Sequence, residues 1–436
     1  MFQTFQNTFK IPELRKRILF TIGLLVVYRI GCHVPTPGID MGVLKSFFAQ
    51  AQGTLFGLYD IFAGGAFKNA AIFGLGIMPY ITSSIIMQLL GAVVPYFQKL
   101  HKEGEEGRRK ITQYTRYGTV LICIFQSYGA SIFLESIVTS QGVSAVVHPG
   151  LGFRLLTMLT LTTGTIFLMW IGEQMTEKGI GNGISLIIYV GILARFPSSI
   201  LNEGRQLAAG THSPFQGLMI LIIMVAVTAS VVAITQAQRR VPVQYAKRVV
   251  GRKIYGGQST HIPLNMNAAG IIPIIFAQSL MFAPRTITTF FPNSDLLKGV
   301  ANWFSPGAAV YSVVYALLII FFAYFYTAIV FNPVELADNM KRYGGFIPGV
   351  RPGKKTADYI DRILTRITLP GALFFAAVAI LPWFMMRSMD VPFYFGGTSI
   401  LIIVGVALDT LKQVESHLVM RHYDGFMKKG KIKGRR

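Results

Sequence analysis

The residues that could carry enzyme chemistry are few in this chain and complete no catalytic motif. GVRPGKKT, residues 349–356, comes nearest to a phosphate-binding loop, but three residues separate its glycines where that loop has four. No strand pattern precedes this segment, so we interpret it as a turn. GIGNG, residues 179–183, lacks the spacing of a dinucleotide-binding loop and fits a tight turn that begins a helix. Neither segment predicts nucleotide chemistry.

Metal and nucleophile chemistry also lack support in the residues. The seven histidines are scattered, and Cys32 and Cys123 lie in or beside apolar runs, which favours packing as small hydrophobes over a disulfide. Glu135, Arg154 and Glu173 lie near the ends of apolar runs, whereas ion-coupled transporters usually carry ionisable groups near the midplane of the membrane. The sequence therefore predicts no catalytic residue, no metal and no cofactor.

The elements that surround these residues are membrane helices. The chain has 436 residues, of which 52% are hydrophobic and 14% are charged, against about 25% charged in a soluble domain. Apolar runs of about twenty residues recur along its whole length, and this is the length that crosses ~30 Å of hydrocarbon. We expect an all-α polytopic membrane protein with ten transmembrane helices. The expected spans are residues 17–35, 73–96, 115–138, 152–173, 183–202, 214–236, 268–291, 306–331, 368–388 and 396–418.

The basic residues predict the orientation of these spans. Of the 41 Lys and Arg, 32 fall in both termini and in alternate gaps between spans. Because cytoplasmic loops carry such an excess, both termini are predicted to be cytoplasmic. Two of these gaps are long, residues 237–267 with six cations and residues 332–367 with seven. Topology and contact with anionic lipid would need fewer cations, so we favour a docking surface for a negatively charged partner.

The two long gaps have different local patterns. RRVPVQYAKRVVGRKIYGG, which begins at Arg239, alternates polar and apolar residues and predicts a hairpin that projects from the membrane. RYGGFIPGVRPGKKT, which begins at Arg342, is rich in glycine and proline and predicts a turn.

One apolar segment is too short and broken to span the membrane. Residues 54–72, TLFGLYDIFAGGAFKNAAI, carry glycines within an apolar run. Irregular backbone at membrane depth is tolerated only where protein or a water-filled cavity surrounds it. The residues alone leave two placements equally open, one inside the helix bundle and one as a helix on the outer surface.

The number of spans suggests an internal repeat. Ten spans divide into five plus five, and an odd number in each half inverts the second half relative to the first. Inverted repeats place a transport pathway at the interface between the halves. This pattern keeps a secondary transporter open as the alternative function, although we find neither midplane carboxylates nor a second broken helix in the sequence.

Isoleucines and small polar residues occupy the expected interior. Ile77 and Ile81 fall in the second span, and Ile188, Ile275 and Ile402 fall in the fifth, seventh and tenth. A ring of apolar side chains can close a pore against water and ions. Each isoleucine taken singly is better explained by packing against lipid or a neighbouring helix.

Seven long segments share their order and spacing with one known family. They are IFGLGIMPYITSSIIMQLL, EGEEGRRKITQYTRYGT, GEQMTEKGIGNGISLII, YAKRVVGRKIYGGQSTHIPL, NAAGIIPIIFA, FNPVELADNMKRYGGFIPGVRPGKKTADYIDR and VPFYFGGTSILIIVGVALD. These motifs resemble bacterial SecY, the channel subunit of the general protein translocase, from about residue 10 to the end. The resemblance implies a clamshell of two pseudo-symmetric inverted halves around a central hourglass pore. It also implies a channel for unfolded preproteins that releases transmembrane segments sideways into lipid, with energy from a partner motor or a ribosome.

The resemblance implies roles for individual residues. Residues 54–72 match the plug that seals the outer funnel, which favours the interior placement, and its candidate residues are Leu55, Phe56, Tyr59, Phe62 and Phe67. The pore ring maps onto Ile77, Ile81, Ile188, Ile275 and Ile402. The lateral gate lies between spans two and three on one side and spans seven and eight on the other, with Thr82, Gln126 and Gln278 as its polar candidates. Partner docking maps onto Arg239, Arg240, Arg252, Lys253 and Arg351.

The resemblance also implies partners and a location. The partners are the subunits SecE and SecG, the motor ATPase SecA, the ribosome through its RNA and proteins, signal sequences, preprotein substrates and anionic lipid. The protein is expected to be no enzyme and to lie in the bacterial inner membrane. Gly256 and Gly257 depart from some relatives, and we have no interpretation for them.

The sequence predicts a domain organisation in five parts. An interfacial helix is expected over residues 1–16, where Phe2, Phe5 and Phe9 share one helical face. The other parts are a first half over 17–202, an external connection over 203–213, a second half over 214–418 and a basic cytoplasmic tail over 419–436.

Overall fold

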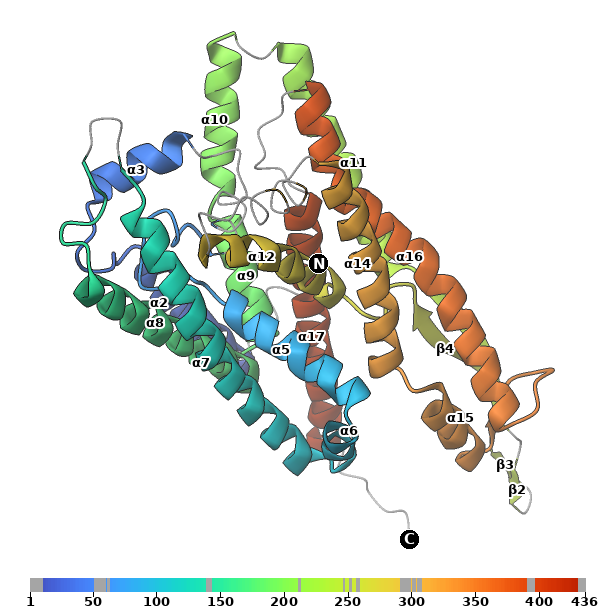
Figure 1. Ribbon diagram of the computed structural model, residues 1–436. Helices are drawn as coiled ribbons and strands as arrows, with labels where there is room; N and C mark the ends of the chain where they lie inside the picture. Colours follow the sequence, from blue (N-terminus) through green and yellow to red (C-terminus); the bar gives the residue numbers. More distant parts are fainter. Residues whose placement is uncertain are drawn as a thin grey trace. The chain divides into compact units, whose positions relative to one another are not determined.

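The computed structural model is a mainly helical protein with two small sheets (Figure 1). It describes residues 11–50, 60, 63–138, 143–210, 213–245, 248–250, 253–255, 259–290, 299, 303, 308–389 and 397–429. Most of the interfacial helix expected over residues 1–16 therefore lies outside the described residues, as does the end of the basic tail. The chain forms two compact units. The first comprises Met1–Gly204, Ser279–Pro306 and Val406–Arg436, and the second comprises Arg205–Gln278 and Gly307–Gly405.

Nine of the described helices belong wholly or mainly to the first unit. They are α2 (Pro12–Gly31), α3 (Met41–Gln50), α5 (Met78–Val93), α6 (Pro95–Lys102), α7 (Glu105–Glu135), α8 (Leu151–Lys178), α9 (Gly183–Leu193), α10 (Phe196–Ala208) and α17 (Gly397–Lys429). The second unit contains α11 (Pro214–Gln236), α14 (Ala309–Val330), α15 (Pro333–Arg342) and α16 (Lys354–Met389). Helix α12 (Ile272–Phe290) begins in the second unit and, from Ser279 on, belongs to the first.

Each of the ten predicted spans overlaps a described helix. Seven described helical segments are long and apolar enough to cross a membrane, and the pair α5 and α6, bent by 97°, adds an eighth if it is one span. Helix α2 falls outside this set and carries Arg15, Lys16, Arg17 and Arg29. The side chains of α12 are described without a break as far as Phe282, and Ile272–Phe282 is apolar. Ten spans fit the fold, although α2 is not membrane-spanning by length and composition alone.

Several helices begin where local chemistry predicts. Pro12 opens α2 with Glu13 in its first turn. Asn182 caps α9 through its side-chain oxygen, which accepts from the amides of Ile184 and Ser185. The GIGNG segment is therefore a turn that begins a helix, as its glycines indicate.

The GIGNG turn also connects helices from the two ends of the chain within the first unit. Thr21 Oγ1 of α2 accepts the amide of Ile180 at 3.1 Å. The amide of Gly181 donates to Gln413 Oε1 of α17 at 2.8 Å. These bonds satisfy peptide groups of the turn, which would otherwise be unpaired at the edge of the helix bundle.

Small polar residues join the helices of the first unit. Ser83 Oγ of α5 donates to the carbonyl of Thr115 in α7 at 2.8 Å, and both side chains are buried. Small side chains of this kind allow helix backbones to approach closely in membranes. Cys32 and Cys123 are buried free thiols, as expected of small packing residues.

The first basic loop forms the predicted hairpin, but its sheet is larger than predicted. Strand β1 (Gln238–Tyr245) pairs antiparallel with β4 (Ser259–Asn265), and the short strands β2 (Arg248–Val250) and β3 (Lys253–Tyr255) pair between them. Strand β5 (Gly345–Phe346), from the second basic loop, adds to the other edge of β1. The two long basic loops therefore share one sheet in the second unit.

A hydrophobic cluster fixes this sheet to neighbouring helices. Val241 and Val243 of β1 are buried with Leu264 of β4, Met340 of α15 and Ile360 of α16. Helix α16 begins at Lys354, well before the predicted span at 368–388, because the basic loop turns directly into the helix. Residues 343–353 of the predicted turn are non-helical, and its last three residues begin α16.

Candidate functional site

The longest described part of the predicted plug, residues 63–72, is irregular and largely buried in the first unit. The amide of Thr36 donates to the carbonyl of Ala70 at 2.8 Å, and the amide of Ile72 donates to the carbonyl of Val34 at 2.9 Å. Such bonds satisfy peptide groups that hydrocarbon could not. The structure therefore encloses these residues, whereas the residue pattern alone left an outer-surface helix equally open.

Two charged contacts hold the same segment. Arg29 Nη1 of α2 donates to the carbonyl of Gly64 at 2.8 Å. Asp60 Oδ1 accepts the amide of Lys68 at 2.8 Å, and Asp60 Oδ2 pairs with the guanidinium of Arg195. Arg195 lies between α9 and α10, so the segment is tied to two separate elements of the first unit.

Glycines let the plug segment approach the surrounding helices. Gly64 has φ +68°, a conformation that a side chain would strain. A Cβ on Gly191 of α9 would lie 3.1 Å from the Cα of Gly64. A Cβ on Gly164 of α8 would overlap the carbonyl of Ile72. Backbone-to-backbone contact of this kind leaves no room for water between the segment and its neighbours.

One aromatic candidate of the predicted plug, Phe67, contacts residues other than these glycines. Phe67 lies between Phe48 of α3 and Phe133 of α7, with ring centroids 5.6 and 6.3 Å away. These rings belong to a buried cluster within the first unit. The other plug candidates lie outside the described residues; they are Leu55, Phe56, Tyr59 and Phe62.

The five isoleucines of the predicted pore ring are all buried. Ile77 and Ile81, at the start of α5, and Ile188 of α9 belong to the first unit. Ile275 of α12 and Ile402 of α17 belong to the second. Burial agrees with a ring and equally with ordinary helix packing, so the ring stays a prediction.

The lateral-gate candidates occupy different environments. Thr82 Oγ1 of α5 lies 2.9 Å from Ser279 Oγ of α12, and both residues belong to the first unit. Gln126 of α7 is half-buried in the same unit. Gln278 is 2% exposed and hydrogen bonds to Tyr311 of α14 in the second unit. The structure thus pairs Thr82 with a serine that sequence reasoning missed.

The described docking candidates are exposed cations on the second unit. Arg239 and Arg240 lie on β1, and Arg351 lies in the turn before α16. None of these three forms an ion pair with another residue that the structure describes. Arg252 lies outside the described residues, and only the backbone of Lys253, in β3, is described. Three guanidinium groups therefore remain available to an acidic partner.

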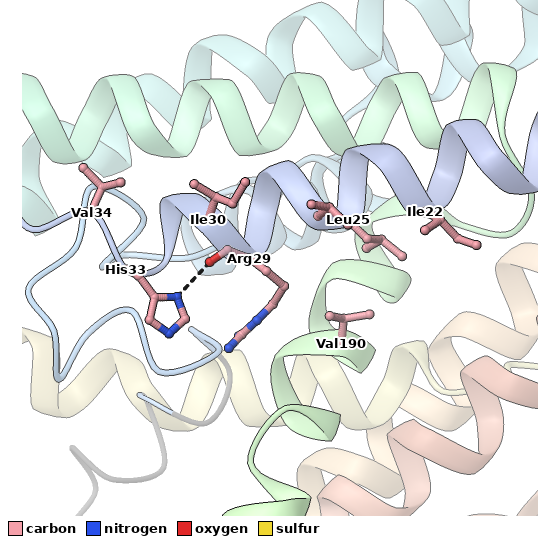
Figure 2. Close-up of a pocket in the computed structure, with 8 residues that line it drawn as sticks. Ile22, Leu25, Arg29, Ile30, His33, Val34 and Val190 are labelled. Carbon is pink, nitrogen blue, oxygen red and sulfur yellow. Dashed lines mark hydrogen bonds between the residues drawn. The ribbon is translucent and has the colours of Figure 1, made fainter.

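A groove of about 690 Å³ follows one face of α2 in the first unit (Figure 2). Its walls are mainly apolar and include Ile22 and Leu25 of α2 and Val190 of α9. Arg29 and His33 are its ionisable groups, and His33 Nδ1 lies 2.9 Å from the carbonyl of Arg29. These residues supply neither a nucleophile with a base nor a set of metal ligands.

Comparison with known proteins identifies the family. The family model for SecY matches residues 71–411. The protein translocase subunit SecY of Escherichia coli strain K12 is 48% identical over 425 residues, which cover 97% of this chain and 96% of that protein. The chain belongs to the SecY family.

Solved channel structures share the fold of this SecY family member. One describes the plug domain of SecY as stabilising the closed state of the translocation channel and maintaining a membrane seal; its TM-score is 0.68 at 18% identity, over 94% of this chain and 96% of that one. Sec61 in the canine ribosome–channel complex has a TM-score of 0.62 at 17% identity, over the same shares of the two chains. The protein is therefore a multi-pass membrane protein and a protein-conducting translocation channel. The alternative of a secondary transporter has no support.

Three contact residues were missing from the sequence-based prediction of the SecY site. They are Asp60, Arg195 and Ser279. A lone carboxylate in the apolar segment 54–72 was the available signal for the first two, because a buried charge requires a partner. Ser279 gave no comparable signal, since a serine in a membrane helix can bond to its own backbone.

Proposed function

We propose that this SecY protein is a passive pore through which unfolded preproteins cross the bacterial inner membrane. A partner motor or a ribosome supplies the energy, and the chain itself performs no catalysis. A signal sequence enters at the lateral gate, the plug leaves its seat, and the isoleucine ring closes loosely around the extended chain. Transmembrane segments leave sideways into lipid.

The enclosed plug segment is the observation that carries this proposal. Residues 63–72 are irregular backbone packed through glycines against membrane helices, and no catalytic cluster lies beside them among the residues described. A segment held by hydrogen bonds and by a few charged contacts can leave without unfolding a helix. This is the property that a removable seal requires.

An apolar ring suits a channel for chains of any sequence. Isoleucine side chains bind no passing residue strongly, yet a narrow apolar constriction excludes water and ions. Ile81→Asn or Ile275→Asn should therefore raise the resting ion conductance of the purified complex in planar bilayers. A polar side chain would let water wet the constriction.

Two variants serve as controls for this experiment. Ile81→Val keeps the position apolar and should keep the resting conductance low. Ile86→Asn places the same polar group on the same helix at a residue that is 45% exposed, and it should not leak. A ring in which several isoleucines are replaced by asparagine and which still shows the wild-type conductance would contradict the proposal.

We assign the docking surface to the sheet that joins the two basic loops. Arg239, Arg240 and Arg351 offer exposed cations on the cytoplasmic side that the charge bias predicts. Such a surface suits ribosomal RNA or an acidic face of SecA, and the canine Sec61 relative was solved in a ribosome complex. SecE, SecG and anionic lipid are the remaining partners that we propose, with both termini in the cytoplasm.

The two-half organisation completes the proposal. We assign the first half to residues 17–202 and the second to residues 214–418, joined by the external connection at 203–213. The interfacial helix at 1–16 and the basic tail at 419–436 flank these halves.

A further inference from the structure

The ion pair between Asp60 and Arg195 places two charges in an apolar part of the first unit. The side chain of Asp60 is 3% exposed and that of Arg195 is 16% exposed. Asp60 belongs to the plug segment, and Arg195 lies just past the end of α9. The pair therefore joins the predicted seal to a membrane helix through a charge interaction.

The two carboxylate oxygens of Asp60 contact different partners. Oδ1 accepts the amide of Lys68 at 2.8 Å, while Oδ2 faces Arg195. The carbonyl of Asp60 also accepts the amide of Gly65 at 2.9 Å. One residue thus bonds to Gly65 and Lys68 of the plug segment and attaches them to the α9–α10 junction.

The free energy of a buried charge depends strongly on whether its opposite charge is present. Two buried opposite charges that face each other are tolerated, but a buried charge without its partner is strongly unfavourable. A plug that leaves its seat removes Asp60 from Arg195. Opening must therefore overcome this interaction until water or another group solvates both charges.

We propose that Asp60 and Arg195 form a latch that holds the plug in its closed position. This inference rests on the proposed function, because it takes Asp60 and residues 63–72 as part of the seal of the channel. Arg195 lies nine residues before Gly204, the last residue of the first unit before the chain enters the second. The latch therefore attaches the plug to the segment that leads to the connection between the units, and displacement of that segment would pull on the plug.

Four variants of the intact channel complex test the latch in planar bilayers. Asp60→Asn keeps an oxygen for the Lys68 amide and removes the charge that faces Arg195. Arg195→Met keeps a long side chain and leaves Asp60 unpaired. The double variant removes both charges, and Arg205→Met is the matched control at an exposed arginine of α10.

We expect each single variant to raise the resting open fraction at least tenfold. The double variant should leak less than the product of the two single effects, because both substitutions remove the same ion pair. Arg195→Lys should recover most of the wild-type closure, and Arg205→Met should behave as the wild type. Two side chains that acted independently in packing would instead give effects that multiply.

Two outcomes would overturn the latch. One is a wild-type open fraction in both single variants, and the other is a double variant whose leak equals the product of the single effects. Ile81→Asn is recorded alongside them. If Ile81→Asn leaks and the latch variants do not, the latch fails and the channel proposal stands; if Ile81→Asn and the latch variants all stay closed, the proposed function fails and the latch fails with it.

Discussion

We expect the hydrogen bond between Thr82 and Ser279 to stabilise the closed form of the predicted lateral gate. Thr82 Oγ1 lies 3.1 Å from the carbonyl of Met78 and 2.9 Å from Ser279 Oγ. Thr82 gives its only hydroxyl proton to the Met78 carbonyl, so the Ser279 hydroxyl donates to Thr82. Ser279→Ala removes this donor, and Thr82→Val removes the acceptor at nearly constant shape.

The expected magnitude follows from an ordinary neutral hydrogen bond. Its net contribution is about 0.5–1.5 kcal/mol, which corresponds to a roughly two- to twelve-fold shift in an equilibrium. Thr82 is half-buried and Ser279 is buried, so water replaces the lost partner only in part. We expect each variant to raise the open fraction of the gate within this range.

The open fraction can be measured by resonance energy transfer between fluorophores attached to α5 and α12 in purified complex. Ser230→Ala in α11 is the matched control, because among the described residues the Ser230 hydroxyl bonds to the carbonyl of Ala226 in its own helix. The double variant Thr82→Val with Ser279→Ala should shift the equilibrium no further than either single variant. Single variants that match the control, or a double variant whose shift is the product of the two, would refute the reasoning.

The remaining predictions concern plug packing and partner docking. Gly164→Ala should lower the midpoint of thermal unfolding, because its Cβ would overlap the carbonyl of Ile72 and such overpacking costs about 1–3 kcal/mol. Gly152→Ala in the same helix meets open space and should cause no such loss, so equal shifts would contradict the packing argument. Arg351→Glu should reduce SecA-driven transport into vesicles while the channel still inserts into the membrane. Arg205→Glu is its control, and normal transport by the Arg351 variant would remove that residue from the docking surface.

Hydrophobic patterns predicted the helices well because burial in lipid depends on local sequence. Each of the ten expected spans overlaps a helix, and the caps at Pro12 and Asn182 follow from residue type. The hairpin around residues 238–265 followed from alternation and its glycines. These features require no knowledge of distant residues.

Contacts between distant residues were the part that sequence patterns missed. Strand β5 has only two residues, so no periodicity distinguishes it from a turn, and its partner β1 lies about a hundred residues earlier. Arg195 was assigned only to the minority of cations outside the cytoplasmic gaps. Its pairing with Asp60 depends on how α9 and the plug meet, which charge counts do not determine.

The hydrogen bond between Gly181 and Gln413 can form only after Gln413 has been synthesised, so the first unit is completed late in synthesis. These residues are 232 positions apart, and ribosomes add about 5–20 residues each second. Roughly 12–46 s therefore pass between synthesis of the GIGNG turn and synthesis of its partner on α17. During that time the Gly181 amide must be satisfied by water or by another protein. The newly made N-terminal helices thus wait for the C-terminal helix before their own unit is complete.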